Sequence, residues 1–295
     1  TITTEAIEKK SVTYADDVPD SVLNTHGKAR AIKFDKVSPE NKFSLAGVQM
    51  KFSMKEKDGR YNLSKGDVLG DWIVKTPSTK HKDVPVNEYT AMKLAELVGV
   101  DIPEIKLVEL NKLDNLPQIN LPDEKLAFAI KRFDRDDYVR IHMEDFAQVL
   151  VKYAHEKYNS ANYEQFARRL LVNILLANGD AHLKNWSLIY SDKITPRLSP
   201  AYDIVTTRVY IDGEQNFALN LGKTKDWYDV SLANFQLWAD RAEIPWRVIR
   251  PHLDDVMEIA RNVWREAIKN LPMNEAHKQK LKDHWSNLHE DFRIK

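Results

Sequence analysis

The chain contains the stretch Asn178-Gly179-Asp180-Ala181-His182-Leu183-Lys184-Asn185, which follows a strongly apolar segment with helical periodicity. A second short stretch, Pro200-Ala201-Tyr202-Asp203, comes soon after it. Asparagine, aspartate and glycine are common turn residues, so an aspartate followed by an asparagine at this spacing is by itself weak evidence. Other parts of the chain must therefore support any chemical interpretation.

Asp180, Asn185 and Asp203 have the residue types and chain order that phosphoryl-transfer sites use. The first aspartate has to face an attacking hydroxyl, and the asparagine has to turn back to a divalent metal on the phosphates. The second aspartate has to coordinate the same metal from the side opposite to the asparagine. One tight loop and the end of the next strand can supply all three groups.

Trp72-Ile73-Val74 reads as a short buried strand, and Lys75 closes it. A lysine at the end of an apolar strand usually extends its ammonium group into solvent. In a nucleotide site, it would instead neutralise the α- and β-phosphates. Both interpretations remain open from the residues alone.

The segment 87–98 follows, with apolar residues at helical spacing. Pro85 suits the helix entry and Gly99 the C-terminal cap. Glu88 is expected in the first turn. There it is either a surface carboxylate favoured by the helix dipole or an ion-pair partner that holds Lys75 toward phosphates.

Two further segments have weaker signals. Residues 43–54 read as two strand pieces around a small-residue turn, with a single glycine that fails both glycine-rich phosphate-loop patterns. An ordinary β-turn is the alternative. Residues 127–135 are an apolar strand that breaks into a charged segment, which suits either a hinge that meets an adenine edge or an edge strand with a basic loop.

Four of these motifs, in this order, resemble the signatures of the HipA-like toxin kinases, the serine/threonine kinases of bacterial toxin–antitoxin systems. The matching stretches are Ser44-Leu45-Ala46-Gly47-Val48-Gln49-Met50-Lys51, Ile130-Lys131-Arg132-Phe133-Asp134-Arg135, residues 178–185 and residues 200–203. The resemblance runs from about Phe43 to at least Leu221.

The resemblance implies a role for each matching residue. Asp180 is the expected catalytic base, with Lys184 reaching the transferred phosphoryl group, and Asn185 and Asp203 hold magnesium. Ser44 falls on the serine that these kinases phosphorylate on themselves, and Glu88 forms the structural ion pair. The expected ATP-binding residues are Ala46, Gly47, Val48, Gln49, Met50, Lys51, Lys75, Lys131, Arg132, Phe133, His182, Asn185, Tyr202 and Asp203.

The implied architecture is an α+β, two-lobed, protein-kinase-like fold. Residues 1–41 form an N-terminal arm, 42–135 a small β-rich lobe with the phosphate loop, lysine strand and one helix, and 136–295 a larger helical lobe. In the last part we expect a strand and turn at 217–222 and helices around 230–241, 246–270 and 273–289, with the tryptophans there packing in the core.

Composition excludes several classes of site. The chain has no cysteine, so disulfides, thiolate catalysis and cysteine metal sites are excluded. No apolar run approaches the roughly 18 residues of a membrane helix, and no signal-peptide core is seen, so we expect a cytoplasmic protein. The 44 basic and 44 acidic residues cancel, so bulk charge does not indicate nucleic-acid binding.

The expected activity, by resemblance, is transfer of the ATP γ-phosphate to a protein hydroxyl, with autophosphorylation at Ser44. The substrate that the resemblance implies is an aminoacyl-tRNA synthetase, tryptophanyl or glutamyl, and its modification would arrest translation and growth. A small-molecule phosphotransferase and a non-catalytic pseudokinase binding module are the alternatives.

Only 43 residues precede Ser44, so the chain is similar to the short form of the family, HipT of the tripartite HipBST systems. We accordingly expect two partners, a HipB-like DNA-binding antitoxin and a small HipS-like protein that resembles the missing N-terminal subdomain. The lobe surface that this subdomain would cover is expected to be left partly apolar.

Overall fold

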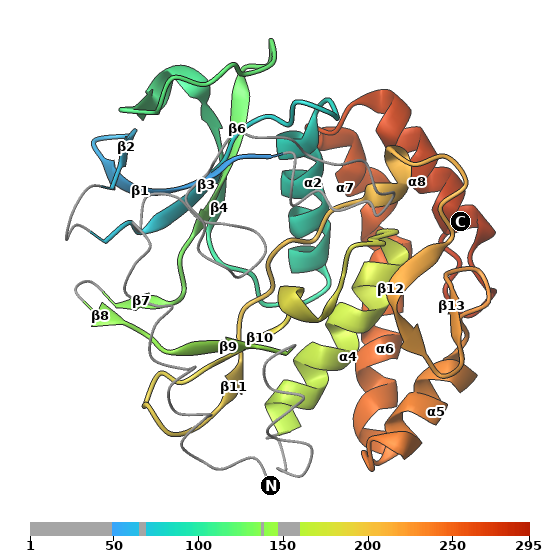
Figure 1. Ribbon diagram of the computed structural model, residues 1–295. Coiled ribbons are helices and arrows are strands. Elements are labelled where there is room, and N and C mark those ends of the chain that lie inside the picture. The colour runs from blue at the N-terminus through green and yellow to red at the C-terminus, as the bar shows by residue number, and fades with distance from the viewer. Residues whose placement is uncertain (1–48, 65–68, 137–138, 147–159) are drawn as a thin grey trace, which may run out of the picture. The chain divides into compact units, whose positions relative to one another are not determined.

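The computed structural model describes residues 49–64, 69–136, 139–146 and 160–295 (Figure 1). The expected N-terminal arm, Ser44 and the phosphate-loop residues 46–48 lie outside the described residues. The chain divides into two compact units. The smaller contains the described residues up to Lys82 together with Lys106–Arg132, and the larger contains Asp83–Ile105 and Phe133–Lys295.

The smaller unit is built on a six-stranded sheet with the order β4-β6-β3-β1-β2-β5. β1 pairs antiparallel with β2 and β3, β3 pairs antiparallel with β6, and β2 pairs parallel with β5. Its elements are β1 (Lys51–Lys57), β2 (Arg60–Leu63), β3 (Trp72–Lys75), β4 (Ile105–Glu109), a 3-10 turn η2 (Leu110–Lys112), β5 (Leu113–Asp114) and β6 (Leu126–Lys131).

The apolar residues of the central strands form the core of this unit. Phe52 and Met54 of β1 and Trp72 and Val74 of β3 are almost completely buried in it. The strand predicted at 72–74 and closed by Lys75 is therefore confirmed as β3. The segment 113–122 begins with the short strand β5, because Leu113 packs into the core.

The larger unit is mainly helical. Its first part contains α2 (Val84–Leu97), β7 (Arg135–Asp136), β8 (Val139–Arg140), β9 (Met143–Asp145), α4 (Ser160–Leu175), η3 (Leu183–Asn185), β10 (Ser187–Ile189), β11 (Arg197–Leu198) and η4 (Thr207–Val209). Its second part contains β12 (Asn216–Leu221), β13 (Thr224–Asp226), α5 (Leu232–Arg241), α6 (Trp246–Ile259), the π-helix η5 (Ala260–Trp264), α7 (Arg265–Asn270) and α8 (Glu275–Asn287).

The helices predicted for the last part of the chain are all present, as is the strand and turn at 217–222. α4 packs along α6, and the two lie side by side in Figure 1. The rings of Trp264 and Trp285 lie 5.5 Å apart and are fully buried, as expected of core aromatics. Trp238 stacks on Phe166 of α4, which gives it the expected packing role.

Helix α2 belongs to the larger unit by its contacts, whereas the sequence placed it in the small lobe. Trp264 Nε1 donates a hydrogen bond to Leu94 O at 3.0 Å, and Met273 N donates to Thr90 Oγ1 at 3.2 Å. The helix begins at Val84, so Glu88 lies in the second turn and not the first. Gly99 follows the helix end with φ of 76°, as the predicted cap requires.

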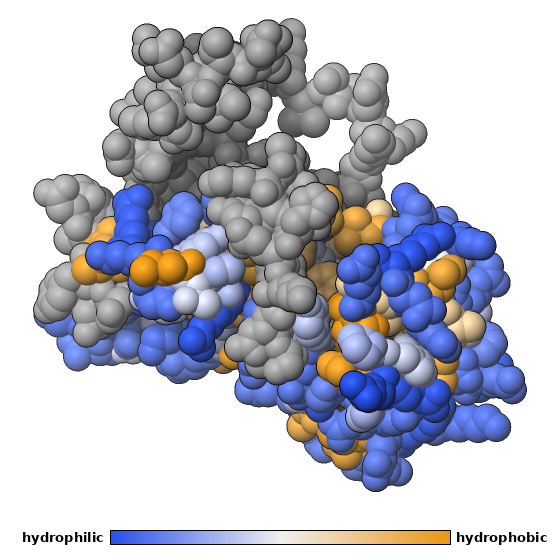
Figure 2. All heavy atoms as spheres, turned by 90° about the horizontal axis from the view of Figure 1, so that it is seen from below, coloured by the Kyte–Doolittle hydropathy of each residue, from blue (hydrophilic) through white to orange (hydrophobic). Residues whose placement is uncertain are grey.

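The surface is mixed in character. Hydrophobic residues are interspersed with hydrophilic ones on the face that Figure 2 shows. The large hydrophobic side chains that are exposed among the described residues are Leu97, Val139, Met143, Ile194 and Val263. All five belong to the larger unit. Separately, no helix among the described residues is long and apolar enough to cross a membrane.

Candidate active site

The stretch 178–185 begins where α4 ends, and side chains of α8 cap that end. His284 Nε2 lies 2.8 Å from Ile174 O, and Trp285 Nε1 donates to Leu175 O at 2.8 Å. Both groups meet carbonyls of the last turn of α4, where intrahelical hydrogen bonding ends, and Ile174 O also accepts from Ala177 N at 3.1 Å. Ala177 then turns the chain with a left-handed φ of 50°, so the loop leaves the helix at a sharp angle.

The loop closes on itself around Asp180. Its carbonyl accepts hydrogen bonds from His182 N at 2.7 Å and from Asn185 Nδ2 at 2.8 Å. Because the Asn185 amide nitrogen is used here, its side-chain oxygen is the atom left to meet a ligand. His182 Nε2 lies 3.8 Å from Asp180 Oδ1, an ion pair only when the imidazole is protonated.

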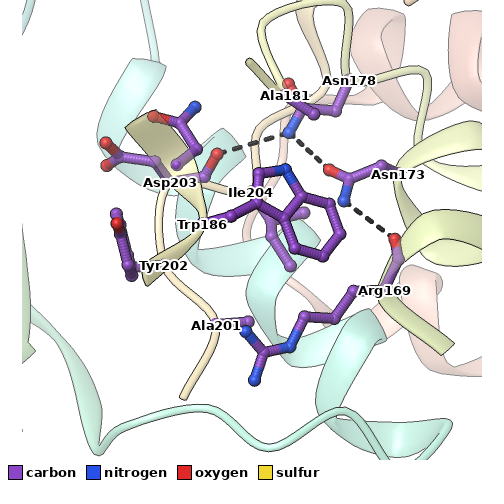
Figure 3. A pocket seen from close by; sticks show the side chains of 10 residues that line it. Arg169, Asn173, Asn178, Ala181, Trp186, Ala201, Tyr202, Asp203 and Ile204 are labelled. Carbon is purple, nitrogen blue, oxygen red and sulfur yellow. Dashed lines mark hydrogen bonds between the residues drawn. The ribbon is translucent and has the colours of Figure 1, made fainter. Parts of the chain in front are cut away.

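Asp203 is tied to the same loop by a chain of buried amides, which Figure 3 shows. Asn178 Nδ2 donates to Asp203 O at 3.3 Å and to Asn173 Oδ1 at 2.7 Å, and Asn173 Nδ2 donates to Arg169 O at 2.8 Å. Asp203 itself has φ of 55°, a conformation that aspartate tolerates better than most residues. The loop and the second aspartate therefore form one connected structure.

Tyr202 anchors the far end of the loop. Its hydroxyl donates to Lys184 O at 2.9 Å and lies 2.5 Å from Ser187 Oγ, so the serine hydroxyl donates to the tyrosine oxygen. Burial raises the pKa of Tyr202, which keeps the phenol protonated for this role. The ring of Phe133 lies 5.8 Å from that of Tyr202, so two of the predicted ATP-binding residues meet.

Arg169 lies under the loop as a buried cation, 3% exposed. Burial lowers the pKa of its guanidinium to about 10, while Asp101 and Tyr202 act in the opposite direction, so the group remains charged at neutral pH. One of its terminal nitrogens donates to Ser199 O. The cation thus holds the chain just before Pro200, at the entry to the Asp203 segment.

The space that these residues enclose is small. It is lined by Asn178, Asn185, Tyr202 and Asp203 among others, and has a volume of about 10 Å³. That volume holds roughly one water molecule, so the cavity is too small for a nucleotide. The side chains beneath the loop are therefore closely packed. Lys184, in contrast, is exposed on η3.

The smaller unit positions the other predicted residues. Lys75 is 4% exposed, and its Nζ lies 5.5 Å from the centre of the Phe128 ring, a cation–π distance. The alternative of a solvated strand-end lysine is therefore wrong. Lys51 lies directly opposite Lys75 in the β1–β3 pair, so two positive charges share one end of the sheet.

The remaining predicted residues of this unit lie at the ends of its strands or next to them. Met50 packs against the core, and its carbonyl accepts a hydrogen bond from Thr76 N at 3.0 Å. Gln49 is 7% exposed, and its Nε2 has no hydrogen-bond partner within the described part of the chain. Lys131 ends β6, Arg132 N donates to Asp71 O at 2.8 Å, and the chain enters the larger unit at Phe133.

Glu88, the predicted ion-pair partner, is 3% exposed. A surface carboxylate that only interacts with the helix dipole is therefore excluded. A carboxylate so deeply buried needs a charged or hydrogen-bonding partner to remain ionised.

Sequence reasoning missed the residues that support the loop from behind, namely Arg169, Asn173 and Thr207. Arg169 and Asn173 lie in an apolar helix, and polar residues on its buried face were the available signal. Thr207 had no signal, because its contacts come from residues far away in the chain.

The family model described as the HipA-like C-terminal domain matches residues 43–264. The chain belongs to this family. A relative named "Putative kinase Y4dM", from Sinorhizobium fredii, is 41% identical over 251 residues, which cover 79% of this chain and 61% of the relative. A "Putative kinase" of Haemophilus influenzae is 29% identical, over 60% of this chain and 57% of the relative.

The "Serine/threonine-protein kinase toxin HipA" of Shewanella oneidensis is 22% identical, over 78% of this chain and 58% of the toxin. The HipA-like chain thus spans about three fifths of the length of these curated relatives.

Two solved structures share the fold. HipA of Shewanella oneidensis, in a complex with HipB and its operator DNA, has a TM-score of 0.64 at 19% identity and covers 86% of this chain and 65% of that one. The Helicobacter pylori proinflammatory kinase CtkA has a TM-score of 0.53 at 17% identity and covers 84% and 90%. The predicted α+β, two-lobed, kinase-like fold is confirmed.

Proposed function

We propose that this HipA-like chain transfers the γ-phosphate of ATP to a serine or threonine hydroxyl of a protein. The observation that carries the proposal is the hydrogen-bonded connection of Asp180, Asn185 and Asp203 through Asn178 and the loop backbone. These are the three side chains that phosphoryl transfer requires from one loop and the following segment.

Each residue has a defined part in the proposed reaction. Asp180 orients the attacking hydroxyl toward the phosphate and accepts the proton of that hydroxyl. Lys184, exposed on η3, neutralises charge on the transferred group. His182, which lies beside Asp180, is proposed to make a polar contact with the nucleotide.

The donor set fits a magnesium ion. The Asn185 side-chain oxygen and the Asp203 carboxylate are hard oxygen ligands, and magnesium is commonly held by one or two such groups together with substrate phosphates. When bound, the ion would neutralise charge on the phosphates.

Lys51 and Lys75 support phosphate binding in the smaller unit. Like charges directly opposite each other in an antiparallel pair repel, and a nearby anion relieves that repulsion. We propose that both lysines contact the phosphates, with Gln49 and Met50 in the adjoining loop and Lys131, Arg132 and Phe133 at the adenine edge. Glu88 is proposed as the partner that orients Lys75. The proposed loop residues 46–48 and the autophosphorylated Ser44 lie outside the described residues.

The biological setting is also proposed. Like the relative named a serine/threonine-protein kinase toxin, the chain is proposed to act as a toxin. Growth arrest and an aminoacyl-tRNA synthetase as substrate are proposed from the resemblance of the sequence motifs. A HipB-like antitoxin is proposed as partner, since the related HipA structure contains HipB. A HipS-like partner rests on the resemblance alone. The described part of the smaller unit exposes no large hydrophobic side chain.

The test uses the purified chain, magnesium and ATP labelled at the γ-phosphate, with a cell lysate as acceptor. Label on protein serine or threonine, including Ser44, supports the proposal. Label on small molecules only, or nucleotide binding without transfer, contradicts it in favour of a small-molecule phosphotransferase or a pseudokinase. Asp180→Asn should reduce transfer at least about a hundredfold, whereas Asp240→Asn, an exposed control on α5, should leave it unchanged.

A further inference from the structure

Thr207 lies at the start of η4, four positions after Asp203, and is completely buried. Its hydroxyl meets three groups of the larger unit: Gly179 N donates to it at 2.8 Å, Ala177 O lies 3.1 Å away, and Glu214 Oε2 lies 2.6 Å away. Its backbone N–H also donates to Ala177 O at 3.1 Å. One side chain therefore touches both ends of the turn that leads to Asp180.

The hydroxyl has one proton to donate. Ala177 O already accepts the backbone N–H of Thr207, whereas the Glu214 carboxylate is the nearer acceptor and the stronger one. The hydrogen bonds therefore run in one direction, from the Gly179 amide to the Thr207 hydroxyl and on to the Glu214 carboxylate. A chain of aligned hydrogen bonds strengthens each member, which favours a rigid connection.

Gly179 is the residue that makes room for this arrangement. A Cβ atom at this position would lie 2.4 Å from Glu214 Oε1 and 3.0 Å from Thr207 Oγ1. Burial raises the pKa of the Glu214 carboxyl, the Thr207 hydrogen bond opposes that effect, and the charge of Asp180 adds to it. The Gly179 backbone and the side chains of Thr207 and Glu214 thus form one cluster directly beside the proposed catalytic base.

We propose that Thr207 is a positioning residue whose hydroxyl fixes the Gly179–Asp180 backbone to the segment that carries Asp203. The hydroxyl is completely buried, and the groups that it meets belong to the protein, so its effect on the reaction would be transmitted through the loop. It sets the distance between the base and the metal-binding aspartate, so its kinetic consequence rests on the proposed function, while the tether itself does not.

The test compares three variants of the full chain. Thr207→Val replaces the hydroxyl by a methyl group of similar size, and Thr207→Ser retains it. Thr90→Val is the matched control, because Thr90 is equally buried and also accepts a backbone N–H, that of Met273, at a place remote from the loop in sequence. If Thr207→Val does not fold, Thr207→Ala replaces it, and thermal unfolding establishes which variants are folded.

Three measurements separate positioning from a general loss of stability. In Thr207→Val, the Gly179 amide should exchange with deuterium at least about tenfold faster, and kcat should fall at least about tenfold, with the Kd for magnesium and ATP within about threefold of wild type. Thr207→Ser should match wild type in all three quantities. Thr90→Val should lower the unfolding temperature without changing Gly179 exchange or kcat.

Wild-type exchange at Gly179 in Thr207→Val would overturn the tether. So would a serine variant that folds but fails to restore it. Equal losses of kcat in Thr207→Val and Thr90→Val would overturn the positioning role. If the wild-type chain transfers no phosphate, the proposed function fails, and the Gly179 exchange in the same three variants still supports or overturns the tether.

Discussion

The side-chain amide of Asn87 and the backbone of Thr206 are hydrogen-bonded in both directions. Asn87 Nδ2 donates to Thr206 O at 3.1 Å, and Thr206 N donates to Asn87 Oδ1 at 2.9 Å. Both residues are completely buried and stand 119 positions apart in the chain. Helix α2, which carries Glu88, is thereby fixed to the segment between Asp203 and Thr207.

Replacing Asn87 by leucine should therefore destabilise the protein. The change leaves the buried N–H and C=O of Thr206 without these partners, and each such group costs about 1–3 kcal/mol. We expect the free energy of unfolding in urea to fall by about 2–4 kcal/mol. Asn287→Leu is the control, because the Asn287 side chain bonds to its own helix at an exposed position, and it should change stability by less than about 0.5 kcal/mol. A small effect at Asn87 would mean that the pair adds little.

Ala177 should tolerate glycine unusually well. Its φ of 50° strains any residue with a Cβ by about 1–2 kcal/mol, so removal of the Cβ relieves strain that offsets the lost methyl packing. We expect Ala177→Gly to stay within about 0.5 kcal/mol of wild type in denaturant unfolding. Ala167→Gly, equally buried in the middle of α4, should cost about 1 kcal/mol or more. Equal losses at the two positions would contradict the strain.

Stability should fall in mild acid because of His284. Burial lowers the pKa of this imidazole to about 4. The backbone contact with Ile174 acts in the opposite direction and Arg208 in the same direction. The unfolded chain, with a histidine pKa near 6.5, binds the proton more readily, so the stabilisation is complete above about pH 6.5 and is lost progressively toward pH 4.

The full effect is about 3 kcal/mol for this shift. Measuring the free energy of unfolding between pH 7 and 4 in wild type and in His284→Gln isolates it, because Tyr228 and Arg208 remain next to the site in both proteins. His277, also with a pKa lowered by burial, contributes equally to both curves. Parallel curves would show that His284 is not the titrating group.

Asp203 should decide whether magnesium strengthens nucleotide binding. In the wild type we expect ATP to raise the unfolding temperature only with magnesium present, because the ion links the nucleotide to the carboxylate. Asp203→Asn removes the charge while keeping a residue that tolerates φ of 55°, so it should abolish the magnesium dependence without unfolding the loop. Asp226→Asn, in β13, is the control. Equal shifts with and without magnesium in the wild type would contradict the metal assignment.

Many elements could be predicted because they depend on neighbours in the chain. The apolar strand 72–75 and the helices of the last part follow from periodicity, and the sequence around Pro85 and Gly99 marks the ends of α2. Glu88 was placed one turn too early, because Asp83 ends the preceding turn with a left-handed φ of 61° and the helix starts directly after it. Local patterns locate helix ends less accurately than helices.

The sequence by itself determined the family of the chain, the residue types of the loop 178–185 and the apolar helix that leads into it. Only the tertiary structure decided that α2 packs in the larger unit, that Arg169 lies buried beneath Tyr202, and that Thr207 joins Gly179. The physical reason is distance along the chain. Periodicity and turn preferences arise from neighbouring residues, whereas a buried hydrogen bond forms only where packing brings remote groups together and excludes water.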